Sequence, residues 1–377
     1  MKIVDRVPEY IRNLVPYAPG KPIEEVEREY GIANSIKLAS NENPLGPSPK
    51  ALEALRQKLQ QLHLYPDGDC FYLKAGLAKK LKVSPEQLIF GNGSNEVIEL
   101  AVRTFMRPGD EAVMARQAFV VYQLVIQAAG GVGRPVPLRN FTHDLGAIAA
   151  AITSRTRIVF LANPNNPTGT IFRRAEWEHF IERIPPEVLL VVDEAYFEYV
   201  EDPEYPDSLL YQGRGRPLLT LRTFSKLYGL AGLRIGYGIA AKEIIDLMQR
   251  VRQPFNVNAP AQWAALAALD DSEHVRRSLE TNRSGMEYLR KEIAALGLEQ
   301  VPSSANFILV RVGDGNDVFQ QLLARGVIVR PVGVYDFPEY VRVTVGTMAE
   351  NRSFIEALKE VIKGYSSSAD KRRGVKI

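Results

Sequence analysis

The residues with the clearest chemical potential surround one lysine. Lys226 stands in a glycine-containing bend directly after residues 217–221, an apolar run with the length and composition of a buried strand. An amine that is partly desolvated and close to other cations loses its proton readily and can then form a Schiff base with a carbonyl. Arg234 follows between Gly232 and Gly236, which would let the backbone approach a bound group closely. A solvated charge is the simpler interpretation of a lone lysine, but this pattern favours a nucleophile.

A second motif, GNGSNE at residues 91–96, lies between an apolar run and a helical pattern. Glycines before a helix present backbone N–H groups and the positive end of the helix dipole, which together form an anion site. Ser94 and Asn95 would stand in the first helical turn. A tight turn capped by Ser94 explains the motif equally well when it is taken alone.

Asp193 ends the apolar run of residues 188–192. A carboxylate in such a place is costly unless it has a partner. A protonated ring nitrogen would be such a partner, and the ion pair would make the ring a better acceptor of electrons. Tyr196, three residues later, could donate a hydrogen bond to the same ring. The alternative is an aspartate that caps a helix after the strand.

Two further segments offer side chains to a flat ring. NPNNPTG at residues 163–169 follows an apolar run, and its prolines and glycine predict a turn that would present Asn166. Phe119, in RQAFVVY, could stack on a ring or be an ordinary core residue, and the two interpretations are evenly balanced.

The strand pattern YVRVTV at residues 340–345 places valines on one face and Arg342 on the other. An arginine there could bind a carboxylate through two parallel hydrogen bonds. Arg330, which ends VIVR, is a second candidate anion contact, with a surface ion pair as the alternative. If the two share this task, the Michaelis constants of anionic substrates depend on them.

The S-K-x₇-R pattern around Lys226 resembles the fold-type I aminotransferases that use pyridoxal 5′-phosphate. The resemblance implies that Lys226 carries the cofactor as a Schiff base, that Arg234 holds its phosphate, and that Asp193 pairs with its ring nitrogen. The other cofactor contacts that it implies are Tyr196 and Asn166 at the ring oxygen, Phe119 stacked on the ring, Ser94 and Asn95 at the phosphate, and also Thr223 and Ser225.

Within that group, the chain most resembles the histidinol-phosphate aminotransferase family. The similarity rests on RNLVPYAPGKPIEEV at residues 12–26, LASNENPLGPSP at 38–49 and YPDGD at 65–69. It implies that Tyr65 reaches the cofactor phosphate of the neighbouring subunit of a homodimer. It also implies that Tyr17 lies near the substrate, with Arg342, Arg330 and Asn166. Phe119 stands where the family has tyrosine, so stacking is kept and a hydroxyl is lost.

The reaction implied by the resemblance transfers an amino group, in two half-reactions, from L-histidinol phosphate to 2-oxoglutarate in histidine biosynthesis. The small-molecule partners are therefore an amino donor and a 2-oxo acid. Three alternatives remain: an aromatic or broad-specificity aminotransferase, a threonine-phosphate decarboxylase, and a regulator that binds the cofactor without turnover. Regulators of that kind generally add a DNA-binding domain, and no helix-turn-helix pattern precedes residue 40.

Composition excludes several classes of function. A net charge of +3 without a dense basic face argues against a nucleic-acid partner. The four histidines are scattered without metal-ligand spacing, and no metal is expected. No apolar run approaches the ~18 residues of a membrane span, no signal peptide is expected, and the single cysteine, Cys70, fits a reducing compartment. The expected location is the cytoplasm.

Short apolar runs that alternate with helical segments predict an α/β fold with a mostly parallel sheet, and the resemblance implies seven strands. The pattern changes after Pro254 to a long helix and an α+β unit. A leucine stripe at 52, 55, 59 and 62 predicts one apolar helix face. The expected organisation is an N-terminal arm with part of a small domain at 1–40, a large cofactor domain at 41–260, the small domain at 261–364 and a disordered tail at 365–377.

Overall fold

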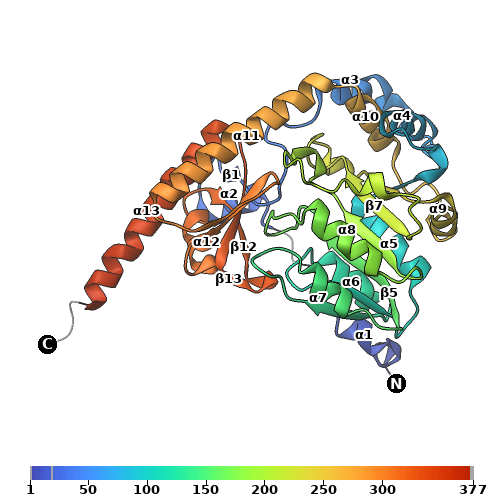
Figure 1. Ribbon diagram of the computed structural model, residues 1–377. Coiled ribbons are helices and arrows are strands. Elements are labelled where there is room, and N and C mark those ends of the chain that lie inside the picture. The colour runs from blue at the N-terminus through green and yellow to red at the C-terminus, as the bar shows by residue number, and fades with distance from the viewer. Residues whose placement is uncertain (1, 18–19, 374–377) are drawn as a thin grey trace.

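The computed structural model describes residues 2–17 and 20–373, which form a large and a small part, each built on its own sheet (Figure 1). The sheet of the large part has seven strands in the order β2-β8-β7-β6-β5-β3-β4. Their bounds are β2 Leu88–Gly91, β3 Glu111–Ala115, β4 Val132–Val136, β5 Thr156–Ala162, β6 Leu189–Asp193, β7 Leu218–Thr223 and β8 Gly236–Ile239. The predicted α/β fold is confirmed.

Only β8 runs against the other strands of this sheet, which is therefore mostly parallel. The predicted apolar runs became strands, whereas β4 was missed because it contains Gly133 and Pro135. Proline is tolerated there because β4 is an edge strand. The carboxyl ends of β5, β6 and β7 lie side by side, with Ala162 opposite Asp193 and Asp193 opposite Leu221. Such an edge is where open α/β sheets bind ligands.

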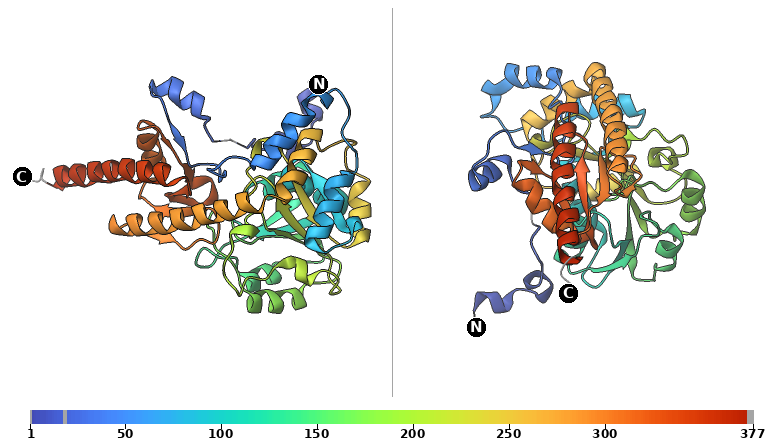
Figure 2. Two further views of the ribbon diagram at one scale, coloured as in Figure 1. Left: turned by 90° about the horizontal axis from the view of Figure 1, so that it is seen from above. Right: turned by 90° about the vertical axis from the view of Figure 1, so that its left-hand side faces the viewer.

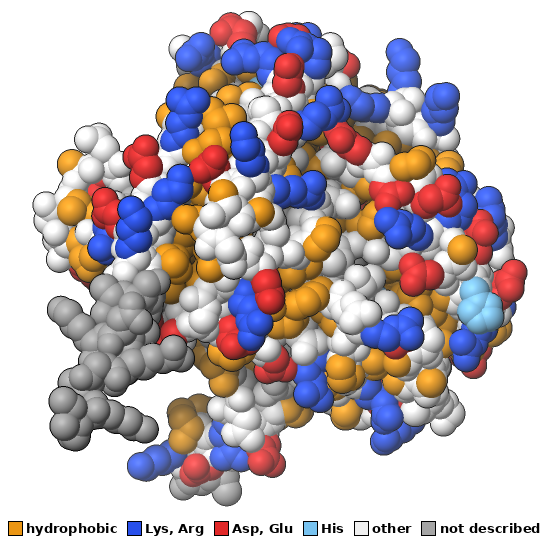
Figure 3. Space-filling model, turned by 60° about the vertical axis from the view of Figure 1, so that its left-hand side comes forward, with side chains coloured by type: hydrophobic (Ala, Val, Ile, Leu, Met, Phe, Trp, Pro, Cys, Tyr) orange, Lys and Arg blue, Asp and Glu red, His pale blue; other side chains and the backbone are white. Residues whose placement is uncertain are grey.

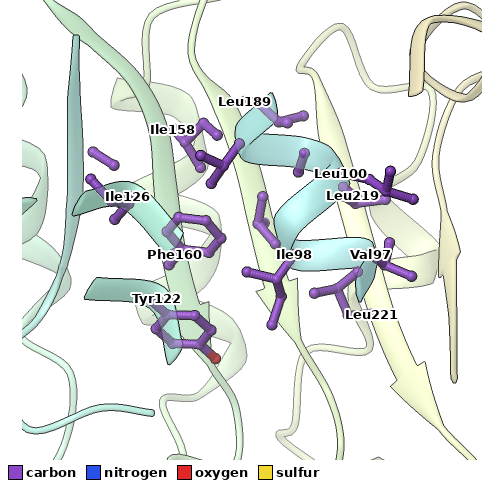
Figure 4. Packing of buried hydrophobic residues seen from close by; sticks show 14 of the residues in the cluster. Val97, Ile98, Leu100, Tyr122, Ile126, Ile158, Phe160, Leu189, Leu219 and Leu221 are labelled. Atoms are coloured by element: carbon purple, nitrogen blue, oxygen red, sulfur yellow. The ribbon is translucent and has the colours of Figure 1, made fainter. Parts of the chain in front are cut away.

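Helices cover both faces of the large sheet. They are α3 Pro49–Lys58, α4 Phe71–Leu81, α5 Gly93–Phe105, α6 Val121–Ala128, α7 Leu145–Ala150, α8 Arg174–Arg183, α9 Lys242–Gln249 and α10 Ala259–Leu269. On one face, Val97 and Ile98 of α5 and Tyr122 of α6 pack against strand residues such as Phe160 (Figure 4). The Tyr122 and Phe160 rings are stacked, with centroids 4.8 Å apart. This core holds the start of α5 and the tip of Tyr122 at the carboxyl edge of the sheet.

The small part contains a four-stranded antiparallel sheet, in the order β12-β13-β10-β9, and a parallel pair of β1 with β11. The bounds are β1 Ile36–Lys37, β9 Gln300–Val301, β10 Phe307–Arg311, β11 Val327–Ile328, β12 Arg330–Val332 and β13 Phe337–Thr344. Of the N-terminal helices, α1 Glu9–Arg12 contacts α6 of the large part, whereas α2 Ile23–Tyr30 packs against the small part through Val26. The remaining long helices are α11 Ser272–Ala295, α12 Gly315–Leu323 and α13 Met348–Arg373.

Short 3-10 helices complete the chain: η1 Ile3–Arg6, η2 Leu59–Gln61, η3 Pro85–Gln87, η4 Phe197–Tyr199, η5 Ser208–Tyr211, η6 Ala231–Leu233 and η7 Gly333–Tyr335. Val341 and Val343 of β13 are buried in the core of the small part, as the alternation predicts. Arg342 therefore lies on the other face of β13, toward the large part.

Two details of the predicted organisation differ from the structure. The boundary after residue 260 falls inside α10, whose alanines pack in the core of the large part, so we propose a boundary at the start of α11. The last helix runs on to Arg373, past the end expected near residue 362, and lies beside α11 (Figure 2). Residues 374–377 of the tail expected to be disordered lie outside the described residues.

The leucine stripe is also not a buried face. The α-helix ends at Lys58 and continues as η2, so the expected helical alignment is broken. Leu55 packs against the core, whereas Leu52, Leu59 and Leu62 are exposed. The stripe therefore leaves apolar side chains on the surface, next to Tyr65.

Charged side chains of both signs are spread over the face shown in Figure 3. Within residues 2–17 and 20–373, no helix is long and apolar enough to cross a membrane.

Candidate active site

A cavity of about 560 Å³ lies at the carboxyl edge of the large sheet, with walls from both parts of the chain. It brings together thirteen of the fourteen predicted site residues: Tyr17, Ser94, Asn95, Phe119, Asn166, Asp193, Tyr196, Thr223, Ser225, Lys226, Arg234, Arg330 and Arg342. These side chains span most of the sequence, so the fold alone makes them neighbours. Tyr65 is absent from the described residues that line the cavity.

The Lys226 amine enters the cavity from the bend after β7. Its Nζ donates a hydrogen bond to the Ser40 carbonyl over 3.2 Å and lies 5.7 Å from the centroid of the Tyr196 ring. Burial, together with the positive charges of Arg342 and Arg234, lowers the pKa of Lys226 from 10.5 to about 8. An amine with this pKa is a competent nucleophile near neutral pH.

Because of its lowered pKa, Lys226 should be labelled with a midpoint at lower pH than an ordinary lysine. At pH 7, a pKa of about 8 leaves ~10% of the amine neutral, against ~0.03% for an ordinary lysine. In cofactor-free protein, reductive alkylation with formaldehyde, followed by mass spectrometry of the peptides, should therefore give a midpoint near pH 8 for Lys226. Lys242, an exposed lysine paired with Asp246, serves as the internal control with a midpoint above 10. Equal midpoints at the two lysines would contradict the prediction.

Asp193, at the end of β6, presents a buried carboxylate to the cavity. Tyr122 donates a hydrogen bond to Oδ2 over 2.8 Å, and the Ala195 N–H donates to Oδ1 over 3.1 Å. Burial raises the pKa of Asp193, while these two hydrogen bonds and the charge of Lys226 lower it. The carboxylate thus lacks a directly bonded cation among the described residues, which suits a cationic ring nitrogen.

An anion cradle lies at the start of α5. Ser94 and Asn95 are in its first turn, where backbone N–H groups point out of the helix. Arg234 lies against this turn, because its Nη2 bonds to the Asn92 carbonyl and would stand 2.6 Å from a Cβ added to Gly93. Gly236 also permits close approach, since its added Cβ would meet the Ser94 nitrogen at 2.3 Å. Gly232 lines the cavity, and nothing lies within 4 Å of a Cβ added there, so its predicted approach to a bound group stays a prediction.

The other predicted cofactor contacts also line the cavity. The Ser225 N–H donates to Thr223 Oγ1, which closes the bend that carries Lys226. Tyr196 is buried, and its hydroxyl oxygen accepts a hydrogen bond from Asn41 Nδ2 over 2.8 Å. Phe119 both lines the cavity and packs against the large core, where it makes an edge contact with Tyr122.

Arg342 and Arg330 enter from the small part. Arg342 Nη2 donates to the Ala39 carbonyl over 2.7 Å, and Nη1 donates to Asn166 Oδ1. Its Nε is buried and has no hydrogen-bond partner among the described residues. The Arg330 guanidinium lies 5.8 Å from the centroid of the Tyr17 ring.

Sequence reasoning missed Tyr122 and Asn41. Tyr122 was hidden in an apolar helix pattern, and its spacing to Asp193 carries no local signal. Asn41 stood in the sequence only within the LASNENPLGPSP segment, whereas a positive φ of 56° and nearly complete burial set it apart in the structure. Neither feature is visible before the chain is folded.

The cavity fits a flat ring that carries an anionic group, a carbonyl and a basic nitrogen. The anionic group would meet the anion cradle, the carbonyl would meet the Lys226 amine, and the basic nitrogen would meet the Asp193 carboxylate. Phe119, Ala162 and Pro164 add apolar atoms to the lining. Pyridoxal 5′-phosphate has this set of groups.

Comparison with known proteins agrees with this geometry. Residues 33–358 match the family described as aminotransferase class I and II. A histidinol-phosphate aminotransferase from Moorella thermoacetica is 53% identical over 95% of this chain and 94% of its own length. One from Caldicellulosiruptor saccharolyticus is 50% identical over 94% of this chain and 99% of its own length.

Among solved structures, histidinol-phosphate aminotransferase from Sinorhizobium meliloti in complex with pyridoxal-5′-phosphate superposes with a TM-score of 0.89 at 28% identity. The match covers 96% of this chain and 98% of that one. The cofactor is therefore pyridoxal 5′-phosphate. The chain belongs to the class I and II aminotransferases and, within them, to the histidinol-phosphate aminotransferase family.

Proposed function

We propose that this protein is a pyridoxal-phosphate-dependent enzyme of the cytoplasm that transfers the amino group of L-histidinol phosphate to 2-oxoglutarate. The observation that carries the proposal is the convergence of Lys226, Asp193, Arg234 and Arg342 on one cavity, in a chain 53% identical to a named histidinol-phosphate aminotransferase. The products are imidazole acetol phosphate and glutamate, and the two half-reactions give ping-pong kinetics.

When bound, the cofactor supplies a carbonyl carbon for amines and a ring that accepts the electron pair released at the substrate carbon. Lys226 holds the cofactor until the substrate amine replaces it. Once freed, the Lys226 amine would move a proton between the substrate carbon and the cofactor carbon. Asp193 keeps the ring nitrogen protonated, and Tyr196 and Asn166 hold the ring oxygen.

The remaining side chains position the two ends of the substrates. Ser94, Asn95 and Arg234 bind the cofactor phosphate at the start of α5. Arg342 binds the carboxylate of glutamate or 2-oxoglutarate in one half-reaction, and we propose that it shares the phosphate of histidinol phosphate with Arg330 and Tyr17 in the other. A cationic pocket suits both ligands because each presents an anion to the same guanidinium groups.

The absorbance spectrum of the cofactor-loaded protein tests the proposal. L-Histidinol phosphate and L-glutamate, added in separate cuvettes, should each convert the bound cofactor to its amino form, and L-phenylalanine should do so weakly. Efficient conversion by phenylalanine would instead identify an aromatic aminotransferase. Release of carbon dioxide from threonine phosphate would identify a decarboxylase, and an unchanged spectrum with every donor would leave a protein without turnover.

Replacing Arg342 with alanine should raise the Michaelis constants of both histidinol phosphate and glutamate by about 10- to 100-fold, because a hydrogen bond to a charged group is worth ~1.5–3 kcal/mol. Steady-state kinetics of each half-reaction measures this. Arg311, on the adjacent strand but exposed and paired with Glu339, provides the matched control, and Arg311→Ala should leave both constants unchanged. Unchanged constants in the Arg342 variant would refute the shared role.

We further propose that the enzyme works as a homodimer in which Tyr65 acts on the neighbouring site. Tyr65 is 84% exposed, is stacked on Phe255 of its own chain, and stands among exposed apolar side chains. The exposed neighbours along this segment are Leu59, Leu62, Leu64, Phe71 and Tyr72. A cluster of this kind favours a subunit interface over free surface.

Mixing of two inactive variants tests this arrangement. If Tyr65 acts across the interface, a dimer of one Tyr65→Ala chain and one Lys226→Ala chain has one complete site, because the former chain keeps its lysine and receives the partner's tyrosine. Random reassociation of equal amounts should then recover about one quarter of wild-type activity. If Tyr65 acts within its own chain, no mixed dimer has a complete site and mixing recovers nothing.

A further inference from the structure

Residues 39–41, between β1 and α3, touch three side chains of the active site in succession. The Ala39 carbonyl accepts from Arg342 Nη2, the Ser40 carbonyl accepts from Lys226 Nζ, and Asn41 Nδ2 donates to the Tyr196 hydroxyl oxygen. Two of these contacts use backbone atoms, which any residue supplies. The contact from Asn41 depends on its side chain.

Asn41 is held in a conformation that few residues adopt. Its φ of 56° lies in the left-handed region, where non-glycine residues are uncommon, and 1% of its surface is exposed. Its backbone is anchored to the small part at both polar groups: the N–H donates to Thr344 Oγ1 over 2.9 Å, and the carbonyl accepts from Asn306 Nδ2 over 3.1 Å. Strain of this kind persists where the surrounding structure holds it and often marks a functional site.

Thr344 also determines which way the Asn41 amide faces. The Thr344 oxygen already accepts the Asn41 N–H, and its single hydrogen is donated to Asn41 Oδ1 over 3.1 Å. If the amide were flipped, Nδ2 would face Thr344 in place of Oδ1, and the Thr344 hydroxyl hydrogen would lose its acceptor. Nδ2 therefore faces Tyr196, and the tyrosine oxygen accepts.

A tyrosine oxygen that accepts from Asn41 keeps its own hydrogen for another acceptor. We infer that Asn41 is a positioning residue that directs the Tyr196 hydroxyl hydrogen into the cavity, toward the ring oxygen of pyridoxal 5′-phosphate. The inference rests on the proposed function, in which Tyr196 contacts that oxygen. The inference adds Asn41 to the residues of the proposed site. The role of Asn41 is to determine the direction of the hydrogen bond that Tyr196 donates.

The surroundings of Tyr196 agree with a hydroxyl that stays protonated and donates. Burial raises the pKa of Tyr196 to about 12, although the charge of Arg342 and the hydrogen bond from Asn41 lower it. The other charged or titratable groups that face it are Asp193, Tyr335 and Lys226. Because Arg342 and Thr344 lie on the same face of β13, the strand that grips the substrate also anchors Asn41.

The pH titration of the bound cofactor's absorbance reports on this hydrogen bond independently of turnover. A donor to the ring oxygen withdraws negative charge from it, so the oxygen holds the nearby exchangeable proton less firmly. Removal of the donor should raise the titration midpoint. For Tyr196→Phe we expect an increase of about one to two pH units.

Asn41→Gly removes the amide while it preserves the left-handed backbone, and it should raise the midpoint by about half a unit to one unit. Thr344→Val, which removes the anchor of the amide, should shift the midpoint in the same direction by less. In a Tyr196→Phe background, Asn41→Gly should cause no additional shift, because the hydroxyl that it directs is gone.

A matched control separates positioning from general destabilisation. Asn351 is another fully buried asparagine, whose side chain bonds to Gly346 away from the cavity. Asn351→Ala should lower thermal stability and leave the midpoint unchanged. A wild-type midpoint in Asn41→Gly, or an equal shift with and without Tyr196, would overturn the inference. Failure of the wild-type protein to bind the cofactor or react with histidinol phosphate would instead overturn the proposed function.

Discussion

Replacement of Lys226 with alanine is expected to abolish transamination, with kcat reduced by about 10⁴-fold or more. The variant loses both the amine that holds the cofactor and the base that moves the proton. A positioned base alone contributes ~10²–10⁴-fold, and loss of the covalent link adds to this. Single-turnover rates with L-glutamate, followed by the absorbance of the bound cofactor, measure the effect on chemistry without product release.

Two variants define the cause of the Lys226 effect. Lys226→Arg keeps a positive charge in the cavity but cannot lose its proton near neutral pH, so it should be as inactive as the alanine variant. Lys242→Ala removes an exposed lysine that pairs with Asp246 and should leave the rate unchanged. Turnover near the wild-type rate in either Lys226 variant would show that another group moves the proton.

Asp193→Asn is expected to lower kcat by about 10³-fold, because a neutral amide cannot keep the ring nitrogen protonated. The side chains are nearly equal in size, and the hydrogen bond from Tyr122 to the retained oxygen can persist. The loss should therefore appear in the proton-transfer step and in cofactor affinity rather than in folding. Single-turnover rates and cofactor titrations separate these two effects.

The adjacent carboxylate provides the control for Asp193. Glu194 is fully buried on the opposite side of the strand end, where Oε2 pairs with Arg222 Nη2 over 2.8 Å. Glu194→Gln leaves Arg222 with Asp207 as its remaining acidic partner and should lower the free energy of unfolding by ~3 kcal/mol. In cofactor-free protein, Asp193→Asn should cost little stability, since burial already disfavours its charge. An Asp193→Asn variant that is unstable but active would show that Asp193 has a structural role and not a catalytic one.

Local sequence was sufficient for those parts of the fold whose signal is local. Six apolar runs became strands of the large sheet, because a run that is buried on both faces must be apolar throughout. The same rule failed at β4, where an edge position allows the glycine and proline that the pattern excludes. It failed again at the leucine stripe, where Leu52, Leu59 and Leu62 are left exposed in the segment that leads to Tyr65.

The cavity shows the same division. Lys226, Asp193 and Ser94 could be predicted because each follows a strand, and the carboxyl ends of parallel strands meet at one edge of the sheet. The side chains that form hydrogen bonds within the site could not be predicted. The hydroxyl of Tyr122 reaches Asp193 across 71 positions of sequence, and Asn41 reaches Thr344 across 303.

The sequence by itself therefore determined the reacting groups, the class of cofactor that suits them, and the parallel sheet that gathers them. The tertiary structure decided what surrounds each group: the burial that lowers the pKa of Lys226, the phenol that bonds to Asp193, and the strained asparagine behind Tyr196. The reason is physical. Strand periodicity arises from neighbouring residues, whereas desolvation and hydrogen-bond direction arise only when distant segments pack together.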